Sequence, residues 1–151
     1  MNAFPAYWLR LVTSIAMLGW LPFLGGLIFT VFPNLSPFDT LIFERAMIGY
    51  GALILAFLGG VRWGIRLQGG AGSDLTFVMG VLGSVLGFIT LLMPYSLALA
   101  VLTVGYGAHG AWDVWSGASG GVPGFYAKMR SFMTWLVCLT LIGILLARGL
   151  L

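Results

Sequence analysis

Residues 46–61 read AMIGYGALILAFLGGV, a run without a charged side chain that ends directly on Arg62. A helix over this run would be about 24 Å long at roughly 1.5 Å per residue. The hydrocarbon core of a bilayer is about 30 Å thick, so the run is slightly short for a crossing. A spanning helix here must therefore carry Arg62 to the membrane interface or slightly below it.

The composition places the rest of the chain in the same class. The sequence has 151 residues, of which 60% are hydrophobic and only 7% are charged. Ordinary soluble domains carry about 25% charged residues, and so few charges cannot cover a surface exposed to water. The formal net charge of +3 is not gathered into a basic cluster, which excludes a nucleic-acid-binding surface. The single cysteine, Cys138, excludes an internal disulfide.

Three further uncharged runs complete the pattern: residues 11–32, 75–112 and 131–147. A single helix over 75–112 would be about 57 Å long, too long for one crossing. This run must fold as a hairpin, and Met93-Pro94-Tyr95 is the expected turn. The sequence therefore predicts an all-α, polytopic membrane bundle of five transmembrane helices in a single domain, residues 1–151. The expected helices cover about 8–32, 42–67, 75–92, 95–115 and 127–148.

The basic residues predict how the bundle is oriented. With five crossings, one side of the membrane holds Arg10, Arg62, Arg66, Lys128 and Arg130, and the other holds Arg45 and Arg148. The positive-inside rule then favours the N-terminus inside and the C-terminus outside. The first apolar run lacks a cleavage signature and an Arg- and Ser-rich transit segment, so we expect a retained helix in a bacterial inner membrane.

Small residues recur along two of the expected helices, and they predict close helix packing. Ala52, Ala56, Gly60 and Gly64 are spaced by four along the second helix, and Gly80, Gly83, Ser84 and Gly87 mark the third. The residues expected in helix packing are Ala52, Ala56, Gly59, Gly60, Gly64, Gly83 and Gly87. The same pattern fits packing within one chain or the face of a homodimer, and the sequence leaves both open.

Arg62 points nearly opposite Gly60 at about 100° per residue, so the second helix has two faces that prefer protein to lipid. We therefore expect this helix at the centre of the bundle. Asp113, near the end of the fourth helix on the same membrane side, is the expected partner of Arg62, and Arg130 could also reach it. Such a pair would offset part of the cost of placing a guanidinium near the membrane.

Tyr106, His109 and Asp113 share one face of the fourth helix, which leaves two interpretations open. One is a proton or ion relay from Asp113 through His109 to Tyr106. The other is an interfacial ion pair between Arg62 and Asp113 that fixes two helices, with the aromatic side chains as anchors. A lone histidine makes a metal or haem site improbable, and we expect no cofactor. No set of nucleophile, base and acid is present, so we expect no enzyme activity.

The segment YGALILAFLGGVRWG (50–64) resembles the signature of an uncharacterised membrane family, domain-of-unknown-function family 3429, which includes transmembrane protein 69 of animal mitochondria. Asp113, PGFYAKMR (123–130) and Thr134 agree with the same pattern. The family's motif residues would here be Trp63, Tyr126 and Arg130. The resemblance implies a small multi-pass protein of bacterial inner membranes and mitochondria, and it implies no activity.

Two functions remain open at this point. The first is a non-enzymatic accessory or assembly factor of a larger membrane complex, which the small size, short loops and small-residue patterns favour. The second is a small ion, proton or solute transporter that uses Arg62, His109 and Asp113. A membrane enzyme acting on lipid or quinone has less support. The expected partners are membrane lipids, other membrane subunits or a second copy of the chain, and no nucleic acid.

Overall fold

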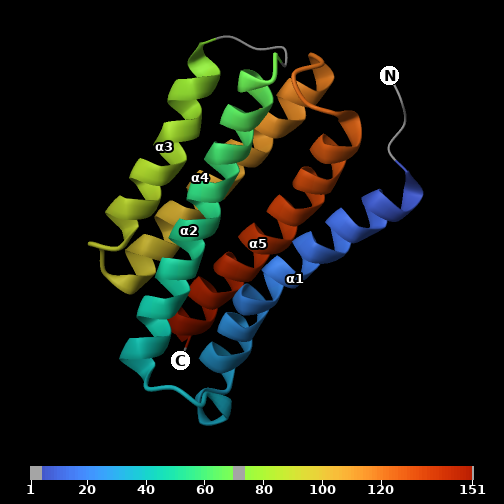
Figure 1. Cartoon of the computed structure of the whole chain (residues 1–151). Helices are drawn as coiled ribbons and strands as arrows, with labels where there is room; N and C mark the ends of the chain where they lie inside the picture. Colours follow the sequence, from blue (N-terminus) through green and yellow to red (C-terminus); the bar gives the residue numbers. More distant parts are fainter. Residues whose placement is uncertain (1–4, 70–73, 151) are drawn as a thin grey trace.

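A computed structural model describes residues 5–69 and 74–150 of the chain. These residues form five α-helices, shown in Figure 1: α1 (Ala6–Val31), α2 (Thr40–Leu67), α3 (Leu75–Thr90), α4 (Tyr95–Ala118) and α5 (Gly124–Leu150). A short 3₁₀ turn, η1 (Pro33–Leu35), connects α1 to α2. No strand occurs within the two described ranges, so the predicted all-α fold with five helices is confirmed.

Local sequence signals set the helix starts. The Asp39 carboxylate accepts a hydrogen bond from the Leu41 backbone N–H at 2.9 Å, which satisfies one of the free donors in the first turn of α2. Pro94 stands directly before α4, so the turn predicted at Met93-Pro94-Tyr95 is confirmed. The last helix begins at Gly124 rather than near 127, because Pro123 can precede a helix without needing a backbone donor.

Three of the five helices are long and apolar enough to cross a membrane, namely α1, α2 and α5. The third helix is apolar but only 16 residues long. The fourth is 24 residues long and carries the polar side chains Tyr106, His109 and Asp113. Length and composition thus identify three candidate spans, with α3 and α4 packed among them.

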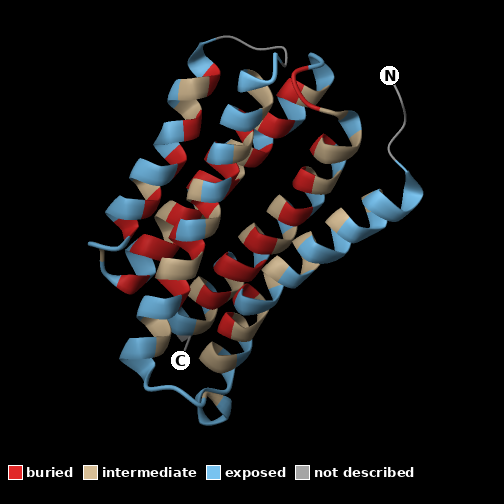
Figure 2. Ribbon diagram, viewed as in Figure 1, coloured by how far each residue is buried: buried red, intermediate tan, exposed pale blue. Residues whose placement is uncertain are grey.

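The sequence predicted α2 at the centre of the bundle, and α2 contacts three helices, α1, α3 and α4. A second helix with three neighbours is α4. It packs against α2, α3 and α5, and buried residues occur from its first turn to its last (Figure 2). Both helices also keep an exposed face: Leu53 and Phe57 of α2 are 71% and 65% exposed, and Val104 of α4 is 72% exposed. The largest fully buried apolar side chains are Phe23, Leu55, Leu99, Leu102, Tyr106, Leu141 and Ile144.

Backbones approach closely where α2 meets α3. A Cβ atom added to Gly80, Gly83 or Gly87 of α3 would lie 2.8–2.9 Å from a carbonyl oxygen of α2. A side chain at these positions would therefore force the two helices apart. Ala52, Gly59, Gly83 and Gly87 thus line this contact, as predicted from their small size, and Ala56 is half-buried.

Gly60 and Gly64 do not line a contact within the described bundle. Both are exposed, and a Cβ atom at either position would meet nothing within 4 Å. The physical reason is the pitch of the helix: a spacing of four exceeds the 3.6 residues of a turn, so the line through Ala52, Ala56, Gly60 and Gly64 rotates by about 40° at each step. The contact with α3 instead runs through Ala52, Leu55, Gly59 and Trp63, in steps of three, four and four.

The first helix is attached to the bundle along only part of its length. Its C-terminal half packs on α5, where the Trp20 indole donates a hydrogen bond to Thr140 Oγ1 at 3.1 Å. Its N-terminal half diverges from the other helices, and Figures 1 and 2 show it as a mostly exposed arm. Leu11, Ile15 and Leu18 in this arm are more than half exposed. These side chains require an apolar environment outside the described bundle.

Candidate functional site

Three charged side chains from three helices meet inside the bundle. Arg62 Nη2 on α2 lies 2.6 Å from Asp113 Oδ1 on α4. Arg130 on α5 donates from Nε to the other carboxylate oxygen, Asp113 Oδ2, at 2.9 Å. The side chains of Arg62, Asp113 and Arg130 are only 5%, 4% and 9% exposed. We call these three residues the charged cluster. It joins α2, α4 and α5 through one carboxylate.

Helical periodicity brings the members of the cluster together. Gly51, Leu55, Leu58 and Arg62 are all buried, and they form one stripe that ends in the guanidinium. Asp113 lies on the buried side of α4, and Arg130 lies about two turns into α5. The structure thus brings together Arg62 and Asp113, whose contact the sequence led us to expect. Arg130 also pairs with Asp113, which the sequence left open.

The cluster carries unbalanced charge. An arginine side chain stays protonated in proteins, so two cations share one carboxylate. Arg62 Nε and Arg130 Nη2 are buried and have no hydrogen-bond partner among the described residues. Trp112 covers part of the Arg62 guanidinium, with the ring centroid 5.9 Å from Cζ. Buried groups of this kind are costly unless they are paired.

The predicted relay through Tyr106 and His109 is not formed as a continuous hydrogen-bonded path. The Tyr106 hydroxyl donates to the Gly51 carbonyl oxygen on α2 at 2.7 Å and is fully buried. The His109 side chain points instead towards α3, where its Nε2 would lie 3.0 Å from a Cβ atom on Gly83. Residues three apart on a helix are neighbours only along its surface. Here they turn towards different neighbouring helices, and this separates the two side chains.

The residues that carry the family resemblance surround the same region. Trp63 donates from its indole to the Phe77 carbonyl oxygen at 2.9 Å, which fixes one end of the α2–α3 contact. Tyr126 lies one turn before Arg130 on α5, beside the charged cluster. Thr134, one turn after Arg130, packs on Gly110 of α4. These side chains hold α3 and α5 against the helices that carry Arg62 and Asp113.

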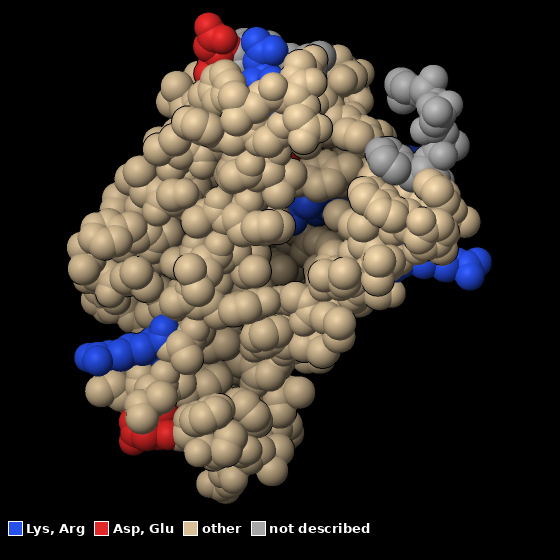
Figure 3. All heavy atoms as spheres, in the orientation of Figure 1, with Lys and Arg blue, Asp and Glu red and all other residues tan. Residues whose placement is uncertain are grey.

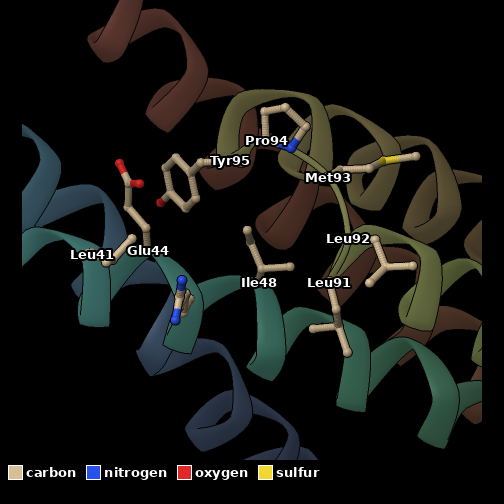
Figure 4. Close-up of a pocket in the computed structure, with 9 residues that line it drawn as sticks. Leu41, Glu44, Ile48, Leu91, Leu92, Met93, Pro94 and Tyr95 are labelled. Atoms are coloured by element: carbon tan, nitrogen blue, oxygen red, sulfur yellow. The ribbon is translucent and has the colours of Figure 1, made fainter.

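A second charged group, which the sequence reasoning missed, lies at the opposite end of the bundle. Arg148 of α5 pairs with Glu44 of α2, and its Cζ lies 4.7 Å from the ring centroid of Tyr95. Counting helix directions would have placed all three residues on the same membrane side. Beside them is an open pocket of about 540 Å³, part of which Figure 4 shows. Its walls include Leu41, Ile48, Leu92 and Pro94, and Glu44 and Tyr95 face it from two helices.

One face of the bundle is hollowed. Figure 3 shows a hollow between α2 and α5 with basic atoms at its floor, while the surrounding surface is almost free of charge. Beside Arg62, a cavity of about 70 Å³ lies among Met79, His109 and Trp112. That volume holds at most a few water molecules. Within residues 5–69 and 74–150, no three His, Cys, Asp or Glu side chains are grouped as metal ligands.

Comparison with known protein families gave one match. Residues 9–146 match the family described as "Protein of unknown function (DUF3429)", which covers nearly the whole chain. No curated protein matches the sequence, and no solved structure matches the fold. Geometry and chemistry must therefore carry the functional argument.

Proposed function

Since this chain belongs to the DUF3429 family, which carries no assigned activity, we propose its function from its own geometry. We propose an integral protein of the bacterial inner membrane that acts as a non-enzymatic accessory or assembly factor of a larger membrane complex. The direct contact between the buried Arg62 and Asp113 side chains carries this proposal.

The proposed topology has five crossings with the N-terminus inside and the C-terminus outside. The start of α1, the end of α2 and the start of α5 lie at one end of the bundle (Figure 1). Five of the seven basic residues then lie in the cytoplasmic half of the bundle, which the positive-inside rule favours. The third helix, with 16 residues, would be about 24 Å long, so the membrane must thin slightly around it.

The charged cluster supports a structural role better than transport. Its three side chains neutralise one another in part and connect three helices, as groups with a positioning role do. A transporter needs a polar path, yet the Tyr106 hydroxyl is held by a backbone carbonyl and the cavity beside Arg62 is only about 70 Å³. The cluster therefore fits a protein whose task is to hold one shape.

The outward face of α2 supports the idea of a partner. Gly60 and Gly64 are exposed, with open space where a side chain would lie, and Leu53 and Phe57 flank them on the same face. Helices associate in membranes by close backbone approach at small residues. We call Leu53, Phe57, Gly60 and Gly64 the open face of α2, and we propose that another membrane subunit packs on it.

The proposal is tested by extracting the tagged full-length protein in mild detergent and measuring the mass and composition of its complex. We expect a discrete assembly that contains a second protein in fixed ratio. Gly60→Leu should disrupt this assembly and leave the amount of protein in the membrane unchanged. Val78→Leu, at a position on α3 that is also exposed, is the control and should leave the assembly intact.

A monomer without any stoichiometric partner would contradict the accessory role. A complex containing only two copies of this chain would also contradict it and would identify the open face as a homodimer contact instead.

A further inference from the structure

We propose that the charged cluster binds the phosphate group of an anionic phospholipid. Arg62 and Arg130 would supply the donors, and the hollow between α2 and α5 would admit the headgroup. The inference rests on the membrane insertion proposed above, and it is independent of the accessory role.

The charged cluster has one positive charge more than its acidic side chains can balance. The chain has four acidic side chains, and Asp113 is the one in the cluster. Asp39 caps the start of α2, Glu44 pairs with Arg148, and Asp74 is 99% exposed near Arg66. None of these three can reach the cluster, so its second positive charge has no side-chain counterion. An external anion is the group that would balance it.

Both arginines of the charged cluster have hydrogen-bond donors without a partner in the described part of the chain. Arg62 Nε and Arg130 Nη2 are fully buried N–H groups without a partner among the described residues. Both belong to guanidinium groups that already hold the two oxygens of one carboxylate, which fixes their orientation. A planar guanidinium offers several donors in a fork that matches the oxygens of a phosphate. The two guanidinium groups on either side of Asp113 would together bind one tetrahedral anion.

The charged cluster lies close to one end of the bundle. Arg62 and Asp113 each lie five residues from the C-terminal end of their helix, and Arg130 lies six residues from the start of α5. At about 1.5 Å per residue, the cluster is roughly 8 Å from the end of the bundle. In the proposed topology this is where headgroups meet acyl chains. The hollow in Figure 3 reaches basic atoms from a surface that is otherwise apolar, which suits a lipid better than a soluble ion.

The test is native mass spectrometry of the full-length protein in detergent, with three probes added separately: phosphatidylglycerol, phosphatidylcholine and inorganic phosphate. We expect one phosphatidylglycerol to bind, in preference to the zwitterionic phosphatidylcholine. Arg130→Met should weaken this binding about tenfold or more, as the loss of one charge-assisted hydrogen bond would. This variant leaves Arg62 and Asp113 as a neutral pair. Arg45→Gln, at an exposed arginine on α2, is the control for general charge attraction.

Binding of phosphatidylglycerol that is equal in the wild type and in Arg130→Met would overturn the proposal, as would a wild type that binds none of the probes. If Arg130→Met cannot be purified, Arg130→Lys keeps the charge, removes the fork and should still weaken binding. Inorganic phosphate that binds as tightly as phosphatidylglycerol would support the phosphate site and identify a soluble ligand. A bound lipid without a protein partner would separate this inference from the accessory role.

Discussion

The two ends of the bundle each carry charged side chains, and they use them differently. At one end, Arg62, Asp113 and Arg130 are almost completely buried and connect three helices. At the other end, Glu44 and Arg148 pair beside an open pocket, with side chains that are 18% and 38% exposed. The first group has two cations for one anion, whereas the second is balanced one to one.

Burial decides how much each group contributes. Water screens the charges of an exposed pair and solvates each partner when the other is lost. A buried charge has no such substitute, so removing its partner leaves it unsolvated. The same residue types should therefore respond very differently to substitution at the two ends.

The largest expected effect is at Asp113. Asp113→Asn keeps the volume of the side chain but leaves Arg62 and Arg130 as two buried cations without an anion. We expect the free energy of unfolding to fall by about 3–5 kcal/mol, as when one partner of a buried ion pair is removed. The measurement is the thermal midpoint of the purified protein in detergent.

Asp74→Asn is the matched control for this variant, because Asp74 is 99% exposed and should tolerate the same change without effect. An equal response of the two variants would show that the burial of the charged cluster does not govern its contribution.

The smallest expected effect is at the opposite end. Glu44→Gln removes the partner of Arg148, which remains partly exposed and stays stacked on Tyr95. We expect a loss of at most about 1 kcal/mol in the same thermal assay, since exposed pairs contribute little. A loss as large as that of Asp113→Asn would remove the distinction between the two ends.

Much of the fold follows from the sequence alone. Uncharged runs and one Met-Pro-Tyr turn were enough to predict five helices and the α3–α4 hairpin, because hydrophobic length and proline act locally. Helix periodicity and the counting of membrane sides placed Arg62 beside Asp113, since both depend only on residue spacing.

The remaining features depend on how the helices pack. A spacing of four does not tell which small residues pack within the chain: Gly59 meets α3, whereas Gly60 and Gly64 meet no helix of the described bundle. The packing of α4 against three helices and the partial attachment of α1 follow from pairwise contacts that no single segment encodes. Likewise, Tyr106 and His109 share a helix face in the sequence, yet they face different neighbours in the bundle.

The central claim is that Arg62 and Asp113 act as members of one charged cluster, and a double-mutant cycle tests it most directly. Thermal midpoints would be compared for Arg62→Met, Asp113→Leu and the double variant. Without Asp113, removing Arg62 relieves repulsion with Arg130, so the double variant should lose clearly less stability than the sum of the single losses. Losses that simply add would show that the two side chains contribute independently and would contradict the account.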